Sequence, residues 1–407
     1  MKPSSITSKQ PSKYHLRTSA LAILVAGLTF FPGVSVVAAP TPAKAALAAL
    51  AVPAPLPLEK LNLPAGFSID IYAHVENARQ MALGANGEIY VGSLRAGKVH
   101  VVQDTDGDFK ADQVQLVAEG LNLPSGLATR NGDLYVGAVN EILVYRDIAA
   151  QLAKPGAALP TSEVVTNTLP EERHHGWKYL EFGPDGYLYI PVGAPCNICL
   201  SDKPVYASIL RMNVDAKPAV LEPYVQGVRN TVGFDWHPDT HELWFTDNGR
   251  DMLGDAIPPC ELNHVTAAGQ HFGYPFFHGA SIADPEFGAG KTAADYIEPA
   301  LALDPHVAPL GMMFYTGKML PEHYRKQIII PEHGSWNRSP EAGHTGHRLT
   351  VAVADAEGNM SYEVLVDGWL QDNVAWGRPA DLLQLADGSI LISDDKANVI
   401  YRLSYQP

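Results

Sequence analysis

The chain has 407 residues, of which 46% are hydrophobic and 18% are charged. This composition excludes a disordered chain, because disordered segments contain too few hydrophobic residues to form a core. Its 29 Lys and Arg stand against 44 Asp and Glu, a formal net charge of −15, which excludes nucleic acid and anionic membrane surfaces as expected partners.

Residues 1–45 are predicted to be an export signal. They contain five Lys or Arg and no acidic residue, and their apolar run, residues 20–31, is only 12 residues long. A basic start, a short apolar run and small residues before a cleavage site are typical of signal peptides. The alternative, a membrane anchor, needs about 20 apolar residues. With cleavage after Ala39 or Ala45, we expect a periplasmic or secreted protein without membrane insertion.

Residues 46–60 are rich in Ala and Pro and are predicted to be a linker. A short pattern then recurs along residues 61–407. The pattern is a turn followed by a short β-like run whose middle residue is aromatic or aliphatic, and it occurs six times. The six copies lie at residues 86–91, 131–136, 185–190, 241–245, 326–330 and 387–392.

Each copy is followed by a second β-like run, and each pair is predicted to form the two inner strands of one antiparallel sheet. The copies recur about every 45 to 61 residues, apart from one gap of about 85 that contains a Pro/Gly/His-rich stretch, residues 274–305. Six such units favour an all-β fold, a six-bladed β-propeller spanning residues 61–407. The alternative is a two-sheet sandwich, which does not explain the long-period repeat.

Cys196 and Cys199 are separated by two residues, and Cys260 is left over. In an exported protein the pair is predicted to be a disulfide; the alternatives are a redox pair or half of a zinc site. The chain has no second CxxC, which argues against structural zinc.

An acidic run carries carboxylates at Asp104, Asp106, Asp108 and Asp112, a spacing that can surround Ca²⁺. A calcium loop of the usual pattern has Gly where this chain has Phe109, so we interpret the run as a metal-free surface loop. Calcium binding is the alternative.

Residues 174–189 (HHGWKYLEFGPDGYLY) resemble the signature of the soluble PQQ-dependent glucose/sorbosone dehydrogenases, most closely the sorbosone-dehydrogenase-like branch. Further matching motifs follow in the order of the family, and the likeness extends over roughly residues 61–405. The resemblance implies a six-bladed propeller that binds pyrroloquinoline quinone (PQQ) and Ca²⁺ over the mouth of its channel. The main motifs are GVRN at 227–230, TDNGRD at 246–251, GQHFGYP at 269–275, HGSWNR at 333–338 and GRPAD at 377–381.

The resemblance also implies roles for individual residues. His175 would be the base that takes the sugar hydroxyl proton, with the adjacent His174 as the alternative. Arg229 would stabilise charge on the quinone as it is reduced. The implied cofactor-binding residues are Asn230, His333, Arg338 and Arg378.

The implied metal ligands are the backbone carbonyls of Gly249 and Arg250, and the carboxylate of Glu261 at a second calcium. The chain departs from the glucose enzymes at Ala194, where they carry Asp, and at Ala380, where they carry Arg. These departures weaken the case for glucose as the substrate.

The predicted function is therefore a PQQ- and calcium-dependent oxidoreductase that acts on an aldose or a related sugar aldehyde. Its partners would be a small-molecule sugar and an electron acceptor that the sequence does not identify. Two alternatives use the same fold: a calcium-dependent hydrolase of the lactonase type, and a binding propeller without catalysis.

Overall fold

The computed structural model describes residues 55–154, 158–279, 281–355 and 358–407. The predicted export signal and residues 46–54 lie outside this part of the chain. Within it, helical structure is limited to α1 (Ile148–Leu152) and to three single turns of 3₁₀-helix, η1 (Leu58–Lys60), η2 (Ala293–Asp295) and η3 (Glu322–Tyr324). No helix among the described residues is long and apolar enough to cross a lipid bilayer.

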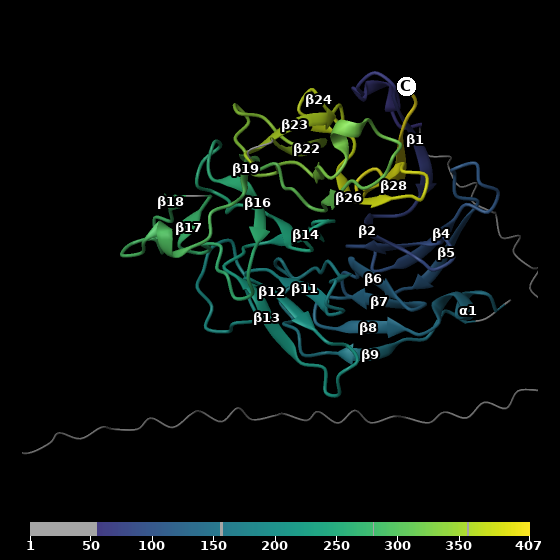
Figure 1. Cartoon of the computed structure of the whole chain (residues 1–407), viewed down its shortest axis with the longest axis horizontal. Helices are drawn as coiled ribbons and strands as arrows, with labels where there is room; N and C mark the ends of the chain where they lie inside the picture. Colours follow the sequence, from purple (N-terminus) through teal and green to yellow (C-terminus); the bar gives the residue numbers. More distant parts are fainter. Residues whose placement is uncertain (1–54, 155–157, 280, 356–357) are drawn as a thin grey trace, which may run out of the picture. The chain divides into compact units, whose positions relative to one another are not determined.

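Six four-stranded antiparallel sheets make up most of the described chain (Figure 1). In each sheet, the two strands expected from the repeats are the two middle strands. The strands of the first three sheets are β2 (Ala78–Leu83), β3 (Ile89–Ser93), β4 (Val99–Gln103) and β5 (Gln113–Ala118); β6 (Gly126–Arg130), β7 (Asp133–Gly137), β8 (Ile142–Tyr145) and β9 (Glu163–Thr166); β10 (Glu181–Phe182), β11 (Leu188–Val192), β12 (Ser208–Met212) and β13 (Leu221–Gln226).

The other three sheets follow the same plan, and each inner edge contacts the next sheet along the chain until the sixth contacts the first. The six-bladed β-propeller is therefore confirmed. The strands are β14 (Thr231–Trp236), β15 (Leu243–Asp247), β16 (Pro259–Val265) and β19 (Leu301–Pro305); β20 (Met313–Phe314), β21 (Ile328–Glu332), β22 (Arg348–Ala354) and β23 (Met360–Val366); β26 (Pro379–Gln384), β27 (Ile390–Asp394), β28 (Val399–Tyr405) and β1 (Phe67–His74).

Glycine explains why the repeat is visible in the sequence. Four of the six repeated turns have a Gly one or two positions before the first residue of the second strand of a sheet, and each of these has φ between 78° and 89°. Residues with a Cβ rarely adopt this conformation, so the tight turn selects Gly. The four are Gly87, Gly132, Gly186 and Gly388.

The second strands are buried on both faces because neighbouring sheets pack against each other. All five residues of β3 are buried, as are all five of β11 and of β27, whereas the outer strand β5 is exposed over half its length. This explains why these strands are near-continuous apolar runs rather than alternating ones.

The ring is closed by the two ends of the chain. Strand β1 pairs with β28 along seven positions, from Phe67 opposite Tyr405 to His74 opposite Val399. This pairing gives the last sheet its fourth, outer strand, so β28 is paired on both sides. Ahead of β1, Leu56 and Leu58 of the predicted linker pack against the core of this sheet; the exact start of the domain stays a prediction.

Residues 274–305 are only partly an insertion. They contain a short hairpin of β17 (Phe277–His278) and β18 (Ile282–Ala283), but their last five residues are β19, the outer strand of the fourth sheet. A second short hairpin, β24 (Leu370–Gln371) with β25 (Val374–Ala375), precedes the sixth sheet.

Replacing Leu403 by Ala should weaken closure of the ring. Leu403 on β28 is fully buried between Ile69 of β1 and Ile390 of β27. Removing its side chain leaves a cavity, and we expect the free energy of unfolding to fall by about 2–5 kcal/mol. Urea unfolding measures this. Val374→Ala, at a side chain that is 69% exposed, is the control and should change stability by less than about 0.5 kcal/mol; equal effects would contradict the closure argument.

Candidate functional site

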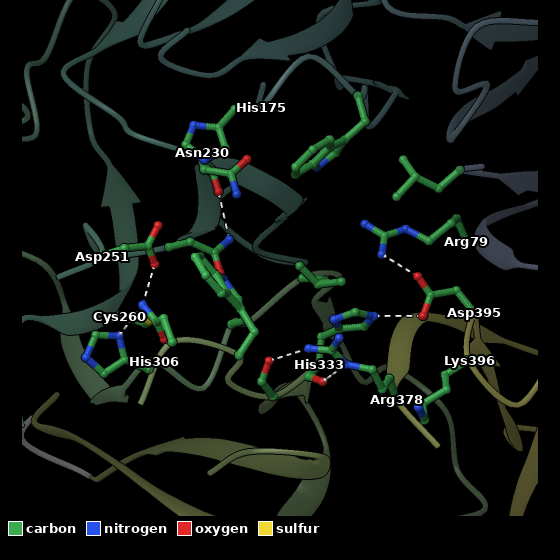
Figure 2. Close-up of a pocket in the computed structure, with 18 of the residues that line it drawn as sticks. Arg79, His175, Asn230, Asp251, Cys260, His306, His333, Arg378, Asp395 and Lys396 are labelled. Atoms are coloured by element: carbon green, nitrogen blue, oxygen red, sulfur yellow. Dashed lines mark hydrogen bonds and ion pairs between the residues drawn. The ribbon is translucent and has the colours of Figure 1, made fainter. Parts of the chain in front are cut away.

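A cavity of about 480 Å³ lies at one end of the propeller. Its lining comes from the loops that precede the first strand or follow the second strand of several sheets, so all of them emerge at the same end. The volume lies within the range of about 300–1,000 Å³ that small-molecule sites occupy. Figure 2 shows His175 and Asn230 on one side of it and Arg79, His333, Arg378 and Asp395 on another.

His175 is held in one tautomer. Its Nδ1 lies 2.9 Å from the carbonyl oxygen of Ala194, and because a carbonyl only accepts hydrogen bonds, Nδ1 carries the proton. Nε2 therefore keeps its lone pair, and it has no hydrogen-bond partner among the described residues. The backbone of His175 has φ of +51°, and Gly193 allows its close approach: a Cβ on Gly193 would lie 2.5 Å from the Cβ of His175.

The surroundings of His175 keep its ring neutral. Burial, followed by the positive charge of Arg229 and the neighbouring His174, lowers the pKa of His175 well below its ordinary value. Trp177 packs edge-on against the ring at 5.9 Å between centroids. The adjacent His174 is exposed, and its side chain forms no hydrogen bond in the described part of the chain. Of the two histidines, His175 therefore has the environment of a general base.

Arg229 is fixed in the wall of the cavity. Its Nε donates to the carbonyl of Asn197 at 2.9 Å and its Nη1 to the carbonyl of Asn248 at 3.1 Å. Its Nη2 donates to Asn197 Oδ1 and to the carboxylate of Asp251, each at 2.8 Å. The side chain is 4% exposed, so its orientation is set by these four contacts.

Asp247, the last residue of β15, holds the segment that carries Arg229 and Asn230. Its carboxylate accepts the backbone N–H groups of Arg229 and Asn230, both at 2.7 Å, and lies 3.2 Å from the hydroxyl of Thr231. Burial raises the pKa of Asp247 to about 6, against the lowering effect of these N–H donors.

Arg378 is held in the same way in the sixth sheet. Its N–H donates at 2.8 Å to Asp394, the last residue of β27. Its Nε and Nη2 donate to the carbonyls of His333 and Gly334, which leaves three of its five guanidinium N–H groups without a partner among the described residues. Burial lowers the pKa of Arg378 because the positive charge is poorly solvated there. An anion that accepts the unpaired N–H groups would stabilise this charge.

His333 is linked to Arg79 through Asp395. The Nε2 of His333 lies 2.8 Å from one carboxylate oxygen of Asp395, and Arg79 lies 3.0 Å from the other (Figure 2). Burial lowers the pKa of His333 to about 4, so a neutral His333 donates from Nε2. Although burial alone would raise the pKa of Asp395, His333 and Arg79 hold it well below its usual range.

The structure brings together six of the nine site residues expected from the sequence. His175, Arg229, Asn230, Gly249, His333 and Arg378 line the cavity, and the other three do not. The side chain of Arg250 forms an ion pair with Asp284 instead. Glu261 is buried behind the wall, where it accepts from Gly279 N and Asn263 Nδ2. Among the described residues, the guanidinium of Arg338 forms one hydrogen bond, to Ala342 O at 3.5 Å.

Sequence reasoning missed Arg79, Asp395 and Asn197 as parts of this end of the propeller. A signal was present in the repeat: Arg229 precedes Asp247, and Arg378 precedes Asp394, at similar distances along the chain. A residue that directly follows the second strand of a sheet is therefore a candidate for the lining of the cavity, and Asp395, which follows Asp394, is one such residue.

The expected disulfide is confirmed: Cys196 is bonded to Cys199, and Cys260 is a free, buried thiol. Burial raises the pKa of Cys260 to about 11. It lines the cavity, but a thiol so weakly ionised is unsuited to act as a nucleophile.

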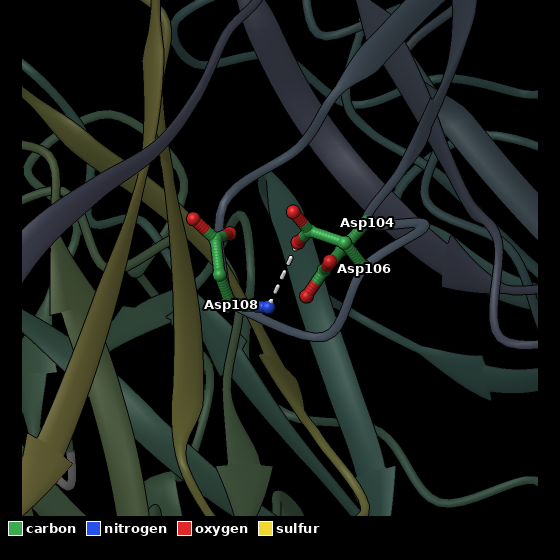
Figure 3. A group of neighbouring side chains, drawn as sticks. All are labelled: Asp104, Asp106 and Asp108. Atoms are coloured by element: carbon green, nitrogen blue, oxygen red, sulfur yellow. Dashed lines mark hydrogen bonds between the residues drawn. The ribbon is translucent and has the colours of Figure 1, made fainter.

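The acidic run forms a loop between β4 and β5, away from the cavity. Asp104, Asp106 and Asp108 bring one carboxylate oxygen each to within 4.8 Å of the others (Figure 3). The two oxygens of Asp104 accept the backbone N–H groups of Gly107 and Phe109, at 2.7 and 2.8 Å. These turn contacts account for the spacing of the acids without a metal, and calcium binding there stays a prediction.

Residues 139–331 match the family model described as glucose/sorbosone dehydrogenase. An uncharacterized protein from Borreliella burgdorferi is 31% identical over 358 residues, which cover 85% of this chain and 91% of that protein. A calcium structure of a carbohydrate-active enzyme of family AA12 from Trichoderma reesei superposes with a TM-score of 0.70 at 18% identity, covering 85% and 97% of the two chains. The holo PQQ domain of a pyranose dehydrogenase from Coprinopsis cinerea gives 0.67 at 16%, covering 84% and 97%.

His175 should stay neutral below the pH at which an ordinary histidine becomes charged. Because the unfolded chain takes up this proton near pH 6.5 and the folded chain does not, lowering the pH through about 6.5 should destabilise the fold. NMR titration of the ring proton between the two nitrogens measures the pKa, and the signal missing from His175→Asn gives the assignment. A midpoint at or above 6.5 would contradict the burial and charge argument.

Proposed function

Because this chain belongs to the glucose/sorbosone dehydrogenase family, we propose that it is a PQQ- and calcium-dependent dehydrogenase that oxidises an aldose or a related sugar aldehyde. It would act in the periplasm or outside the cell, as the predicted export signal implies. The observation that carries the proposal is a neutral His175 with a free Nε2, facing a cavity whose other wall carries incompletely paired arginines.

The cavity suits PQQ by charge. PQQ carries three carboxylates, and carboxylates are bound best by guanidinium groups that can donate two parallel hydrogen bonds. Arg378 has three N–H groups without partners among the described residues, and Arg79, Arg95 and Lys396 lie around the same end. The chain as a whole has a net charge of −15, so this local excess of positive charge supports a site for an anionic ligand.

Metal ligands of the kind that Ca²⁺ prefers are also present. Among the described residues, no hydrogen bond reaches the carbonyl oxygen of Gly249 or of Arg250, and Gly249 lines the cavity. Such oxygens would complete a calcium site together with the cofactor. Glu261 would serve a second calcium. Burial and the charge of Asp247 raise its pKa to about 7, and the Oδ1 atom of the fully buried Asn263 has no hydrogen-bond partner in the described part of the chain.

When bound, the quinone supplies the two-electron sink that receives the hydrogen from the sugar carbon. The protein's residues do the rest. His175 takes the hydroxyl proton at Nε2, while the carbonyl of Ala194 holds its ring by Nδ1. Arg229 keeps one N–H unpaired among the described residues, and its charge favours electron density on a reduced group beside it. Asn230, fixed by Asp247, lies in the same wall.

The two departures from the glucose enzymes change the site in different ways. At 194 the side chain is a buried methyl group, and the backbone carbonyl contacts His175 instead. Ala380 is buried against Val232 and Leu310 in a small apolar cluster. Neither position provides a polar group that recognises glucose, so we propose an aldose substrate without naming the sugar.

Replacing His175 by Ala should abolish most sugar oxidation. We expect the PQQ- and Ca²⁺-reconstituted protein to reduce an artificial dye when aldoses are added, and His175→Ala to lower kcat by about 10²–10⁴-fold, because the proton acceptor is lost. The matched control is His174→Ala, which should lower kcat by less than about tenfold. The reverse order of effects would assign the base to His174. No quinone binding by the wild type at micromolar PQQ would overturn the proposed function.

Replacing Arg378 by Ala should weaken PQQ binding. Losing a charge-assisted contact to a carboxylate should raise the Kd by about 10–100-fold, measured by quenching of tryptophan fluorescence in Ca²⁺ buffer. Arg130→Ala, at a surface arginine paired with Asp215, is the control for a general loss of positive charge. Unchanged affinity in Arg378→Ala would show that the cofactor does not use this end of the cavity.

A further inference from the structure

The disulfide closes a short loop behind the wall of the cavity. Cys196 and Cys199 follow β11, and the loop between them contains Asn197. Tyr274, which is only 4% exposed, holds the loop from its other side: its hydroxyl accepts the N–H of Cys199 at 3.0 Å and lies 3.6 Å from the sulfur of Cys196. The loop is thus fixed by a covalent bond and by a partly buried hydrogen bond.

Asn197 uses this fixed position to hold Arg229. Its backbone carbonyl accepts Nε of Arg229 at 2.9 Å, and its Oδ1 accepts Nη2 at 2.8 Å. Asn197 therefore accepts hydrogen bonds along the whole Nε–Nη2 edge of the guanidinium, an edge that can otherwise donate two parallel hydrogen bonds to a carboxylate.

The same side chain ties Arg229 to the acid that neutralises it. Oδ1 of Asn197 also accepts the N–H of Asp251 at 2.8 Å, and Nδ2 donates to the carbonyl of Asp251 at 3.0 Å. The carboxylate of Asp251 pairs with Arg229 at 2.8 Å through one oxygen and accepts Asn337 Nδ2 at 2.5 Å through the other. An amide of this length provides both the acceptor and the donor that these contacts need.

From these contacts we propose that Asn197, held by the Cys196–Cys199 disulfide, is a positioning residue that sets the orientation of the Arg229 guanidinium in the cavity wall. Asn197 does not line the cavity, so it acts through Arg229 rather than on a ligand. Its catalytic consequence rests on the proposed function, whereas its effect on Arg229 does not.

The first test follows Arg229 in the cofactor-free protein, labelled with ¹⁵N-arginine. The Nη–H signals of Arg229, assigned by their loss in Arg229→Lys, should exchange with solvent about tenfold faster or more in Asn197→Ala, because this substitution removes the Oδ1 acceptor of Nη2. Asn197→Asp keeps both acceptors for Arg229 and should preserve slow exchange. Asn213→Ala, which removes a surface asparagine that contacts only the backbone of a turn, should leave the signals unchanged.

The second test is a double-mutant cycle on PQQ affinity. Asn197→Ala should weaken binding by about tenfold in the wild-type background, and by less than about twofold when Arg229 is already Ala, because its effect passes through Arg229. Cys196→Ser/Cys199→Ser should change Nη–H exchange and affinity in the same direction as Asn197→Ala, by a smaller factor.

The two tests separate the two proposals. If the wild type does not bind PQQ, the proposed function fails, and the exchange measurement still decides the role of Asn197. Equal Nη–H exchange in the wild type and in Asn197→Ala would overturn the positioning role, as would an equal loss of affinity from Asn197→Ala in both backgrounds. Asn197→Asp exchanging as fast as Asn197→Ala would also overturn it.

Discussion

Two buried carboxylates, Asp247 and Asp394, set the geometry on which the cavity depends. Each is the last residue of the second strand of its sheet. Asp247 accepts the backbone N–H of Arg229 in the fourth sheet, and Asp394 accepts the backbone N–H of Arg378 in the sixth. Burying a carboxylate costs free energy unless hydrogen bonds satisfy its oxygens. The backbone N–H groups that supply these hydrogen bonds are therefore also the contacts that hold the arginine-bearing loops in place. Because the sheets form a closed ring, these two loops meet across one cavity although about 150 residues separate them in the chain.

The electrostatics of the site follow from this arrangement. The two arginines are paired to different extents among the described residues. Four of the five guanidinium N–H groups of Arg229 donate to backbone carbonyls, Asn197 and Asp251, whereas three of the five of Arg378 have no partner. The first is suited to act as a fixed charge, and the second to bind an anionic ligand. His175 lies close enough to Arg229 for that charge to help keep its ring neutral, so the fixed arginine and the neutral base are consequences of the same packing.

Much of the fold could be predicted because its determinants are local. The repeated turns with Gly87, Gly132, Gly186 and Gly388, each followed by an apolar run, mark the middle strands of their sheets. Strand β1 could not be predicted in this way, because it pairs with β28 from the far end of the chain, and no local pattern records that contact. For the same reason the outer strand β19 was assigned to an insertion. Residues of the site were found by resemblance where a short motif carried them, as with His175, Arg229 and Arg378.

The period of the repeat, the six-sheet architecture and the pairing of Cys196 with Cys199 could be predicted from the residues, and the family resemblance added six of the residues around the cavity. What these residues contact depends on the folded ring. The carbonyl of Ala194 sets the tautomer of His175, Arg250 turns away to Asp284, and Asn197 reaches across 32 residues of sequence to hold Arg229. The reason is physical: strand formation depends on neighbouring residues and their burial, whereas a tautomer, a free N–H group or a lowered pKa depends on atoms that only ring closure brings together.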